Sequence, residues 1–374
     1  MERVKFINRE NLRIARENVG LDTLSAARKI SQSKSDIVFA FESGDLLPTW
    51  PQISKLAKIY EVPELVFFSN EKIEKNKVVP DYRIGQSAEN DEKIKKLINL
   101  VIKRQKWLKR HIGTETKKNN LQGCGKNIEN PEQLAGLIKK NLDIDLDEIK
   151  KFSGWNSRKK ALDYLIHKAE DRGIFVGKTI SYHMISVRDM RGLYISDDCC
   201  PFIIINRKDA VSAQIFSFVH ELAHLFRKTE SVSNSLEFRQ IDGNESNEEI
   251  FCNKTAVELL LPAADFSKVF YDLADIDSVA EIYKVSKLAI FYRLKSLNKI
   301  HCGQASDIEK QIKEELKKNL EIKNSRKSKG GSYINSMRDS NGNLFNNIVA
   351  SLYYENKIGY AEASRALNFS VEKI

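Results

Sequence analysis

Residues 216–226, FSFVHELAHLF, contain the pattern that decides how this chain is interpreted. His220, Glu221 and His224 form an H-E-x-x-H pattern inside a run with helical apolar spacing, Ser212–Arg227. Residues four apart lie on one face of a helix, so both imidazoles can reach one metal ion. Composition alone gives roughly 0.01 chance matches to the pattern. We therefore expect a metal site on a helix, and the competing interpretation is a pair of buried histidines without a metal.

The chemistry that suits this spacing is hydrolysis. A catalytic Zn²⁺ takes three protein ligands and leaves one position open. Such an ion activates water and polarises a carbonyl group. Glu221 directly follows His220. On a helix, this step of one residue turns the Glu221 carboxylate toward the same metal, where it can act as a general base. The sequence therefore predicts a zinc-dependent peptidase in which Glu221 is catalytic.

The third protein ligand is expected on the next long helix, Asn247–Leu261, because the other histidines lie far away in the sequence. This helix offers Glu248, Glu249 and Glu258. Glu249 lies three positions before Cys252, on the face that turns toward the core. The spacing favours Glu249 over Glu248 as the ligand, and the alternative is that all three acids are solvated.

The segment around this pattern mixes helical and extended signals. Helical spacing over Pro131–Leu142 and Ser157–Arg172 is followed by four short runs of β character: Ile174–Gly177, Met184–Arg188, Leu193–Ile195 and Phe202–Ile205. This predicts one small antiparallel sheet with flanking helices, an α+β domain. The run Pro201–Asn206 has two interpretations that do not exclude each other: a core strand, and a strand beside which an extended peptide substrate adds.

The rest of the chain is interpreted as helical. The expected limits are an all-α domain at 1–70, a linker with a basic amphipathic helix (Asp91–His111) at 71–130, the α+β domain at 131–305, and a charged helix with a small helical tail at 306–374. Within the α+β domain, residues 277–297 resemble a further helix-turn-helix segment.

Composition narrows the setting. The chain has 374 residues and a net charge of +10, from 61 basic and 51 acidic residues, which is compatible with nucleic-acid binding. Its five cysteines are scattered without a CxxC pair, which favours reduced thiols. No apolar run is long enough for a membrane span and no signal peptide is visible. A cytoplasmic protein without a membrane partner is expected.

Four segments together resemble a known family. They are Arg191-Gly192, the run 201–206, FSFVHELAHLF and residues 249–262, EIFCNKTAVELLLP. Over roughly residues 131–300 the chain resembles the ImmA/IrrE family of zinc metallo-endopeptidases. In that family two histidines and a glutamate bind zinc, which carries over to His220, His224 and Glu249, with Glu221 catalytic. Cys252 stands where alanine is common, and Thr255 where an aromatic residue is common.

The resemblance implies a zincin-like fold, a Zn²⁺ cofactor and a regulatory role. Members occur in bacterial or phage regulatory loci, where they cleave, or trigger the loss of, a helix-turn-helix repressor. Some lie beside toxin–antitoxin genes. The resemblance therefore implies a protein substrate, either a repressor or an antitoxin.

Residues 9–68 resemble a Cro/repressor-type (Xre) helix-turn-helix domain, through Phe41–Gly44, Pro48 and the closing segment 53–68. The resemblance implies DNA as a partner, with these candidate contacts: Arg28, Lys34 and Ser35. The third helix, at 35–41, lacks the Arg, Asn and Gln side chains that read base edges. A protein-docking module is the alternative.

Three functions follow in order of preference. The first is a regulatory zinc metallo-endopeptidase that cuts a repressor or antitoxin. The second is a non-enzymatic DNA-binding regulator or antitoxin whose peptidase-like domain is a partner-binding surface. The third is a structural DNA-binding protein with chance histidines. Glu221 favours the first, because a site that only binds metal has no use for a general base.

Overall fold

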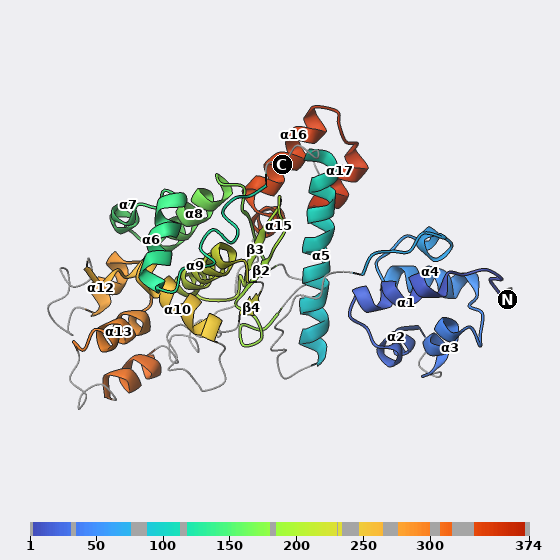
Figure 1. Cartoon of the computed structure of the whole chain (residues 1–374), viewed down its shortest axis with the longest axis horizontal. Coiled ribbons are helices and arrows are strands. Elements are labelled where there is room, and N and C mark those ends of the chain that lie inside the picture. The colour runs from blue at the N-terminus through green and yellow to red at the C-terminus, as the bar shows by residue number, and fades with distance from the viewer. Residues whose placement is uncertain are drawn as a thin grey trace. The chain divides into compact units, whose positions relative to one another are not determined.

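A computed structural model of the chain describes residues 3–30, 35–75, 88–112, 118–179, 185–229, 231–233, 247–264, 276–299, 307–315 and 333–370. Its internal contacts divide the chain within helix α5 (Ala88–Ile112), between Arg104 and Gln105, into an N-terminal and a C-terminal unit (Figure 1). In the parts of the chain that are described, no helix has the length and apolar character needed to cross a membrane.

The N-terminal unit is all-α, as predicted. Its elements are α1 (Arg9–Asn18), α2 (Thr23–Ile30), α3 (Ile37–Ser43), α4 (Trp50–Ile59) and the 3-10 helix η1 (Glu64–Phe67). Gly44 ends α3 in a left-handed conformation with φ 91°, which glycine adopts without steric cost. Thr49 and Gln52 form a capping box at the start of α4.

The core of the N-terminal unit is apolar, and a buried ion pair joins two of its helices. Apolar side chains from α1, α2, α3, α4 and η1 form one buried cluster. Arg16 on α1 and Glu42 on α3 are joined by two hydrogen bonds of 2.6 and 2.8 Å. Arg16 also donates to the Leu21 carbonyl at 2.7 Å. This pair fixes α3 against α1.

The C-terminal unit contains most of the helices. They are α6 (Pro131–Asn141), α7 (Leu146–Lys151), α8 (Ser157–Glu170), α9 (Val211–Arg227), α10 (Asn247–Leu260), α12 (Ile276–Ile282), α13 (Lys287–Ser296), a helix at 307–315, α15 (Tyr333–Asn341), α16 (Asn343–Tyr354) and α17 (Tyr360–Leu367). The helix expected to carry the H-E-x-x-H pattern is therefore confirmed within one residue at its start. The two helices expected within 277–297 are also present.

The sheet is mixed, which corrects the antiparallel sheet expected from the sequence. Its strands are β1 (Phe175–Lys178), β2 (Gly192–Ile195), β3 (Phe202–Ile205) and β4 (Ser231–Ser233), in the order β1-β3-β2-β4. β1 pairs parallel to β3, and the other two pairings are antiparallel. Every residue of β1, β2 and β3 is buried. Strands buried on both faces have no alternation, so their pattern does not reveal their direction.

Three further details differ from the sequence-based predictions. The expected strand Met184–Arg188 is not a strand over its described part, because Ser186 accepts hydrogen bonds from Asp189 and Met190 in a tight turn. Met184 itself lies outside the described residues. Strand β4 was not predicted, since Ser-Val-Ser is short and has no apolar alternation. Strand β3 lies between β1 and β2, so an added peptide strand has no free edge there and β3 is a core strand.

Helix α9 is the central element of the C-terminal unit. It contacts α6, α8, α10 and strands β2, β3 and β4 (Figure 1). Every residue from Ala213 to Phe226 is buried, and a helix buried on all sides is held rigidly by its neighbours. On the far edge of the sheet, α15 and α16 contact β1. His220, Glu221 and His224 therefore lie on a helix that is buried over most of its length.

Candidate metal centre

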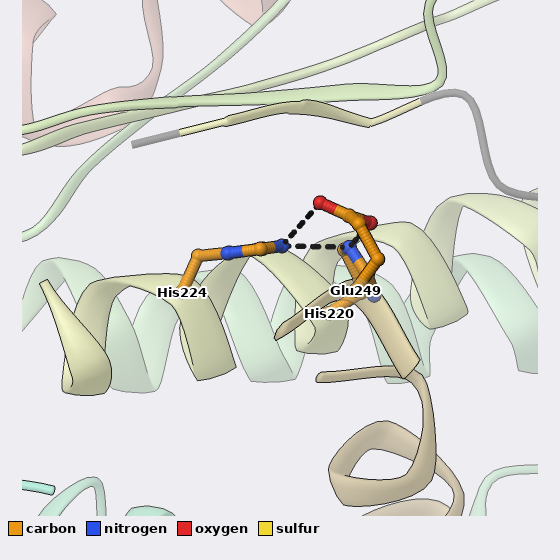
Figure 2. Close-up of side chains that lie close together, drawn as sticks. All are labelled: His220, His224 and Glu249. Carbon is orange, nitrogen blue, oxygen red and sulfur yellow. Dashed lines mark hydrogen bonds and ion pairs between the residues drawn. The ribbon is translucent and has the colours of Figure 1, made fainter. Parts of the chain in front are cut away.

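Three side chains with metal-binding groups meet between α9 and α10 (Figure 2). His220 and His224 project from α9, and Glu249 projects from the first turn of α10. The Nε2 atoms of the two histidines lie 3.0 Å apart. The Glu249 carboxylate lies 3.2 Å from each of them, through one oxygen per histidine. The structure thus brings together the three residues that the sequence assigned as ligands.

These distances bring three side chains within reach of one metal ion. Ligands about 2.0–2.1 Å from Zn²⁺ stand about 3.3–3.4 Å apart at the corners of a tetrahedron. The two Nε2 atoms lie 3.0 Å apart, and each lies 3.2 Å from a different oxygen of Glu249, so the three side chains are close enough to share one ion. Both histidines are 1% exposed and the Glu249 side chain 18%, and a carboxylate largely removed from water between two imidazoles is stabilised by positive charge. The residues present therefore fit a divalent metal bound by two nitrogens and a carboxylate.

The electrostatics of the cluster favour positive charge between its members. Burial opposes the charged form of Glu249, but hydrogen bonds with His220 and His224 outweigh it and hold the pKa of this carboxyl well below its usual range. Burial likewise acts to lower the pKa of His220, and the hydrogen bond with Glu249 outweighs it and raises that pKa. Glu249 is therefore ionised at neutral pH, as a metal ligand has to be.

Glu221 lies against the backbone of strand β2. Its side chain is fully buried. A Cβ atom on Gly192 would lie 2.4 Å from Oε1 of Glu221, so only glycine at this position leaves room for the carboxylate. The Arg191-Gly192 dipeptide, at the start of β2, thus has a packing role next to the proposed base. Its importance could be read from the sequence only through the family resemblance.

The other acidic candidates on α10 have different partners. Glu248 pairs with Arg227, with a hydrogen bond of 3.0 Å from Nη2 to Oε2. Glu258 forms two hydrogen bonds with Arg293, of 2.8 and 2.6 Å. Neither acid is solvated in the way the alternative expected. Of the three, Glu249 is the one whose carboxylate reaches both histidines.

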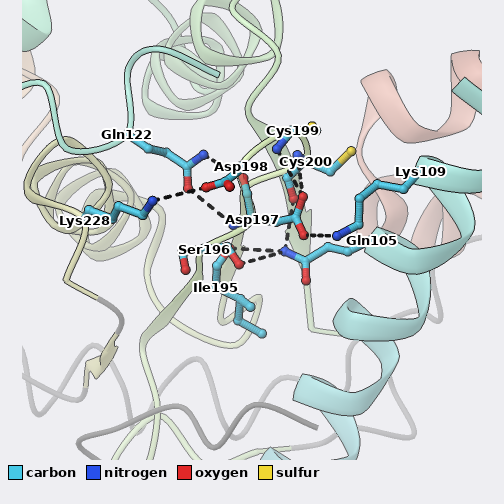
Figure 3. Close-up of polar contacts among 10 residues, drawn as sticks. All are labelled: Gln105, Lys109, Gln122, Ile195, Ser196, Asp197, Asp198, Cys199, Cys200 and Lys228. Carbon is cyan, nitrogen blue, oxygen red and sulfur yellow. Dashed lines mark hydrogen bonds and ion pairs between the residues drawn. The ribbon is translucent and has the colours of Figure 1, made fainter. Parts of the chain in front are cut away.

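The end of helix α9 is fixed by two neighbouring segments. Gly123 and Gly125 donate backbone hydrogen bonds to the carbonyls of Leu225 and Phe226, at 3.1 and 2.8 Å. Beyond the helix, Lys228 pairs with Asp198 in the loop between β2 and β3 at 3.1 Å (Figure 3).

The loop between β2 and β3 is itself tied to α5 and to the segment before α6 (Figure 3). Gln105 and Lys109 of α5 bond to Cys200 and Asp197, and Gln122 bonds to Asp197. Residues 118–128, which the sequence suggested were part of a connector, therefore help to hold the helix that carries the histidines.

The candidate DNA contacts lie in the N-terminal unit. Arg28 on α2 and Ser35, just before α3, are both exposed. Lys34 lies outside the described residues. Two apolar side chains on the same pair of helices are also exposed, Leu24 at 43% and Phe39 at 60%. Helices α2 and α3 thus expose both a cation and apolar side chains.

Comparison with known proteins finds a matching family model, within the C-terminal unit. Residues 176–295 match the family model of the IrrE N-terminal-like domain, a family of metallopeptidases. The match covers β1 through α13 and contains all four proposed site residues. It supports an ImmA/IrrE-type domain at these residues and makes a bound metal plausible. No curated protein and no solved structure matches the chain.

Proposed function

We propose that the chain is a zinc-dependent metallo-endopeptidase in which His220, His224 and Glu249 hold the metal and Glu221 is the general base. The observation that carries this proposal is the meeting of three donor side chains at 3.0–3.2 Å. Two of them are buried on α9, the helix that also bears Glu221, and the third is on α10. The family match at 176–295 supports the same class of enzyme.

Each residue has a definite part in the proposed chemistry. The metal, when bound, polarises the scissile carbonyl group and activates water. His220 and His224 offer neutral Nε2 atoms, and Glu249 offers a negative carboxylate that balances the charge. The Glu221 carboxylate accepts a proton from the attacking water and passes it to the leaving amine. Burial of α9 keeps these side chains in one arrangement before substrate arrives.

The proposed substrate is a transcriptional repressor or an antitoxin, cut at one or few sites in a bacterial or phage-derived locus. This substrate class is supported by the resemblance of the C-terminal unit to ImmA/IrrE peptidases. It is also supported by the all-α N-terminal unit, which we propose to be a helix-turn-helix domain. We propose that this domain directs the peptidase either to DNA or to a protein partner.

The experiment that tests the enzyme is the exchange Glu221→Gln. The amide is nearly isosteric, so the fold and the three metal-binding residues remain. It cannot accept a proton at neutral pH, and general-base catalysis contributes about 10²–10⁴-fold. We expect zinc content and thermal unfolding to match the wild type, while cleavage of a co-expressed repressor or antitoxin encoded beside this chain falls below detection on gels.

The same variant distinguishes the enzyme from a binding protein. If Glu221→Gln relieves repression or neutralises a toxin as well as the wild type does, proteolysis is not the working activity. That result would replace the peptidase with the non-enzymatic regulator.

A further inference from the structure

The ring of His224 is contacted on the side away from the candidate metal site by Thr229, two residues beyond the end of helix α9. Lys228 has a left-handed conformation, with φ 59°, and the N–H groups of Lys228 and Thr229 donate to the carbonyls of Leu225 and His224, both at 3.0 Å. This is the Schellman arrangement that closes a helix. It returns the Thr229 side chain to the same turn, where Oγ1 lies 3.0 Å from Nδ1 of His224.

Thr229 is in turn bonded to an acid on α10. Its hydroxyl donates to Oε1 of Glu248 at 3.2 Å. Glu248 is fixed by the Arg227 guanidinium, which also donates to the Ile128 carbonyl at 2.7 Å and lies over the Phe251 ring at 4.4 Å. A chain of contacts thus runs from Arg227 through Glu248 and Thr229 to the back of the His224 ring.

The direction of these hydrogen bonds follows from proton counting. Glu248, paired with an arginine, is an acceptor only, so the single hydroxyl proton of Thr229 points toward it. Thr229 can then only accept from His224. Nδ1 of His224 must carry a proton, so Nε2 is the nitrogen left to bind a metal together with His220 and Glu249.

We infer that Thr229 and Glu248 are positioning residues that hold His224 in the tautomer able to bind the metal through Nε2. This inference rests on the proposed metal site. It assigns different roles to two adjacent acids, with Glu249 facing the metal and Glu248 acting through Thr229. It also accounts for the second cluster that could hold a metal, formed by His224, Glu248 and Cys252. In this assignment the cluster is support for the first site.

The test is zinc affinity, measured on the full-length chain by competition with a chromogenic chelator. Thr229→Val keeps the shape of the side chain but removes the hydroxyl, and Thr229→Ser restores the hydroxyl. Loss of such outer contacts costs 10–100-fold in metal affinity. We expect zinc to bind about 10–100-fold more weakly to Thr229→Val, and Thr229→Ser to recover most of that loss.

Glu248→Gln and Glu258→Gln provide the matched pair on helix α10. Both acids pair with an arginine, but only Glu248 reaches Thr229. We expect Glu248→Gln to weaken zinc binding and Glu258→Gln to leave it unchanged. Equal zinc affinity for wild type and folded Thr229→Val, with far-UV circular dichroism as the check on folding, would overturn the inference.

A second measurement separates this inference from the proposed function. In the metal-free chain, ¹⁵N NMR of the imidazoles reports whether Nδ1 of His224 carries a proton. We expect a protonated Nδ1 in the wild type and in Thr229→Ser, and its loss in Thr229→Val. If the three proteins show this pattern but the wild type binds no zinc, the result contradicts the proposed peptidase and supports the Thr229 contact. An unprotonated Nδ1 in the wild type would contradict the contact itself.

Discussion

Gly192 sets how closely strand β2 approaches the proposed general base. A Cβ atom at this position would lie 2.4 Å from Oε1 of Glu221 and 2.8 Å from its Cγ, so Gly192→Ala must displace the carboxylate or the strand. Misplacing a catalytic group by about 1 Å can cost 10²-fold in rate. We expect Gly192→Ala to lower the cleavage rate about 10²-fold while zinc content stays at the wild-type level.

The matched control for this exchange is Gly136→Ala on helix α6. Nothing lies within 4 Å of a Cβ built at Gly136, and alanine is the better helix former. Its cleavage rate should equal that of the wild type. Full activity in Gly192→Ala would mean that Glu221 is not held where the structure places it, and would remove the packing role of Gly192.

At the scale of single residues, the sequence predicted which site residues share one helix face. The spacing of His220 and His224 and the face of Glu249 follow from 3.6 residues per turn, and the structure places these three together. The contact of Thr229 with His224 depends on a left-handed residue beyond the helix end. No periodicity encodes such a residue, so this part of the site was not predicted.

The contact between helices α1 and α3 depends on the ion pair of Arg16 and Glu42. Their side chains are each 9% exposed, and removing one partner of a buried pair costs about 3–5 kcal/mol. We expect Arg16→Met to lower the stability of the N-terminal unit by that amount, measured by hydrogen exchange of α1 and α3 amides in the full-length chain.

Arg13→Met is the control on the same helix. Arg13 pairs with Glu17 at 3.7 Å, and both side chains are well exposed, 51% and 36%. Exposed pairs contribute about 0–1 kcal/mol, so exchange of the same amides should hardly change. Equal protection in Arg16→Met and Arg13→Met would show that the buried pair does not hold α3.

Elements were predicted best where a cap or a periodic face marked them. Helix α9 begins within one residue of its expected start, and α3, expected at 35–41, ends at Ser43 with Gly44 as its cap. The direction of β1 was wrong because strands buried on both faces carry no alternation. Strand β4 was missed because pairing with β2 forms it, and its own side chains give no signal.

For the whole molecule, the net charge of +10 bears on what the N-terminal unit binds. If its α2–α3 surface contacts phosphates through Arg28, Arg28→Ala should weaken DNA retention and reduce the slope of log affinity against log salt by about 1. The measurement is fluorescence anisotropy of the full-length chain with duplex DNA at several salt concentrations. No retention at low salt would favour protein docking, to which the exposed Leu24 and Phe39 are suited.

Zinc content of the purified full-length chain tests the central claim most directly. The account predicts about one Zn²⁺ per chain and its loss in His224→Ala, because His224 supplies one of the three donors. His167→Ala is the control, since His167 is 71% exposed on α8, and it should keep the metal. Full zinc occupancy in folded His224→Ala would contradict the account.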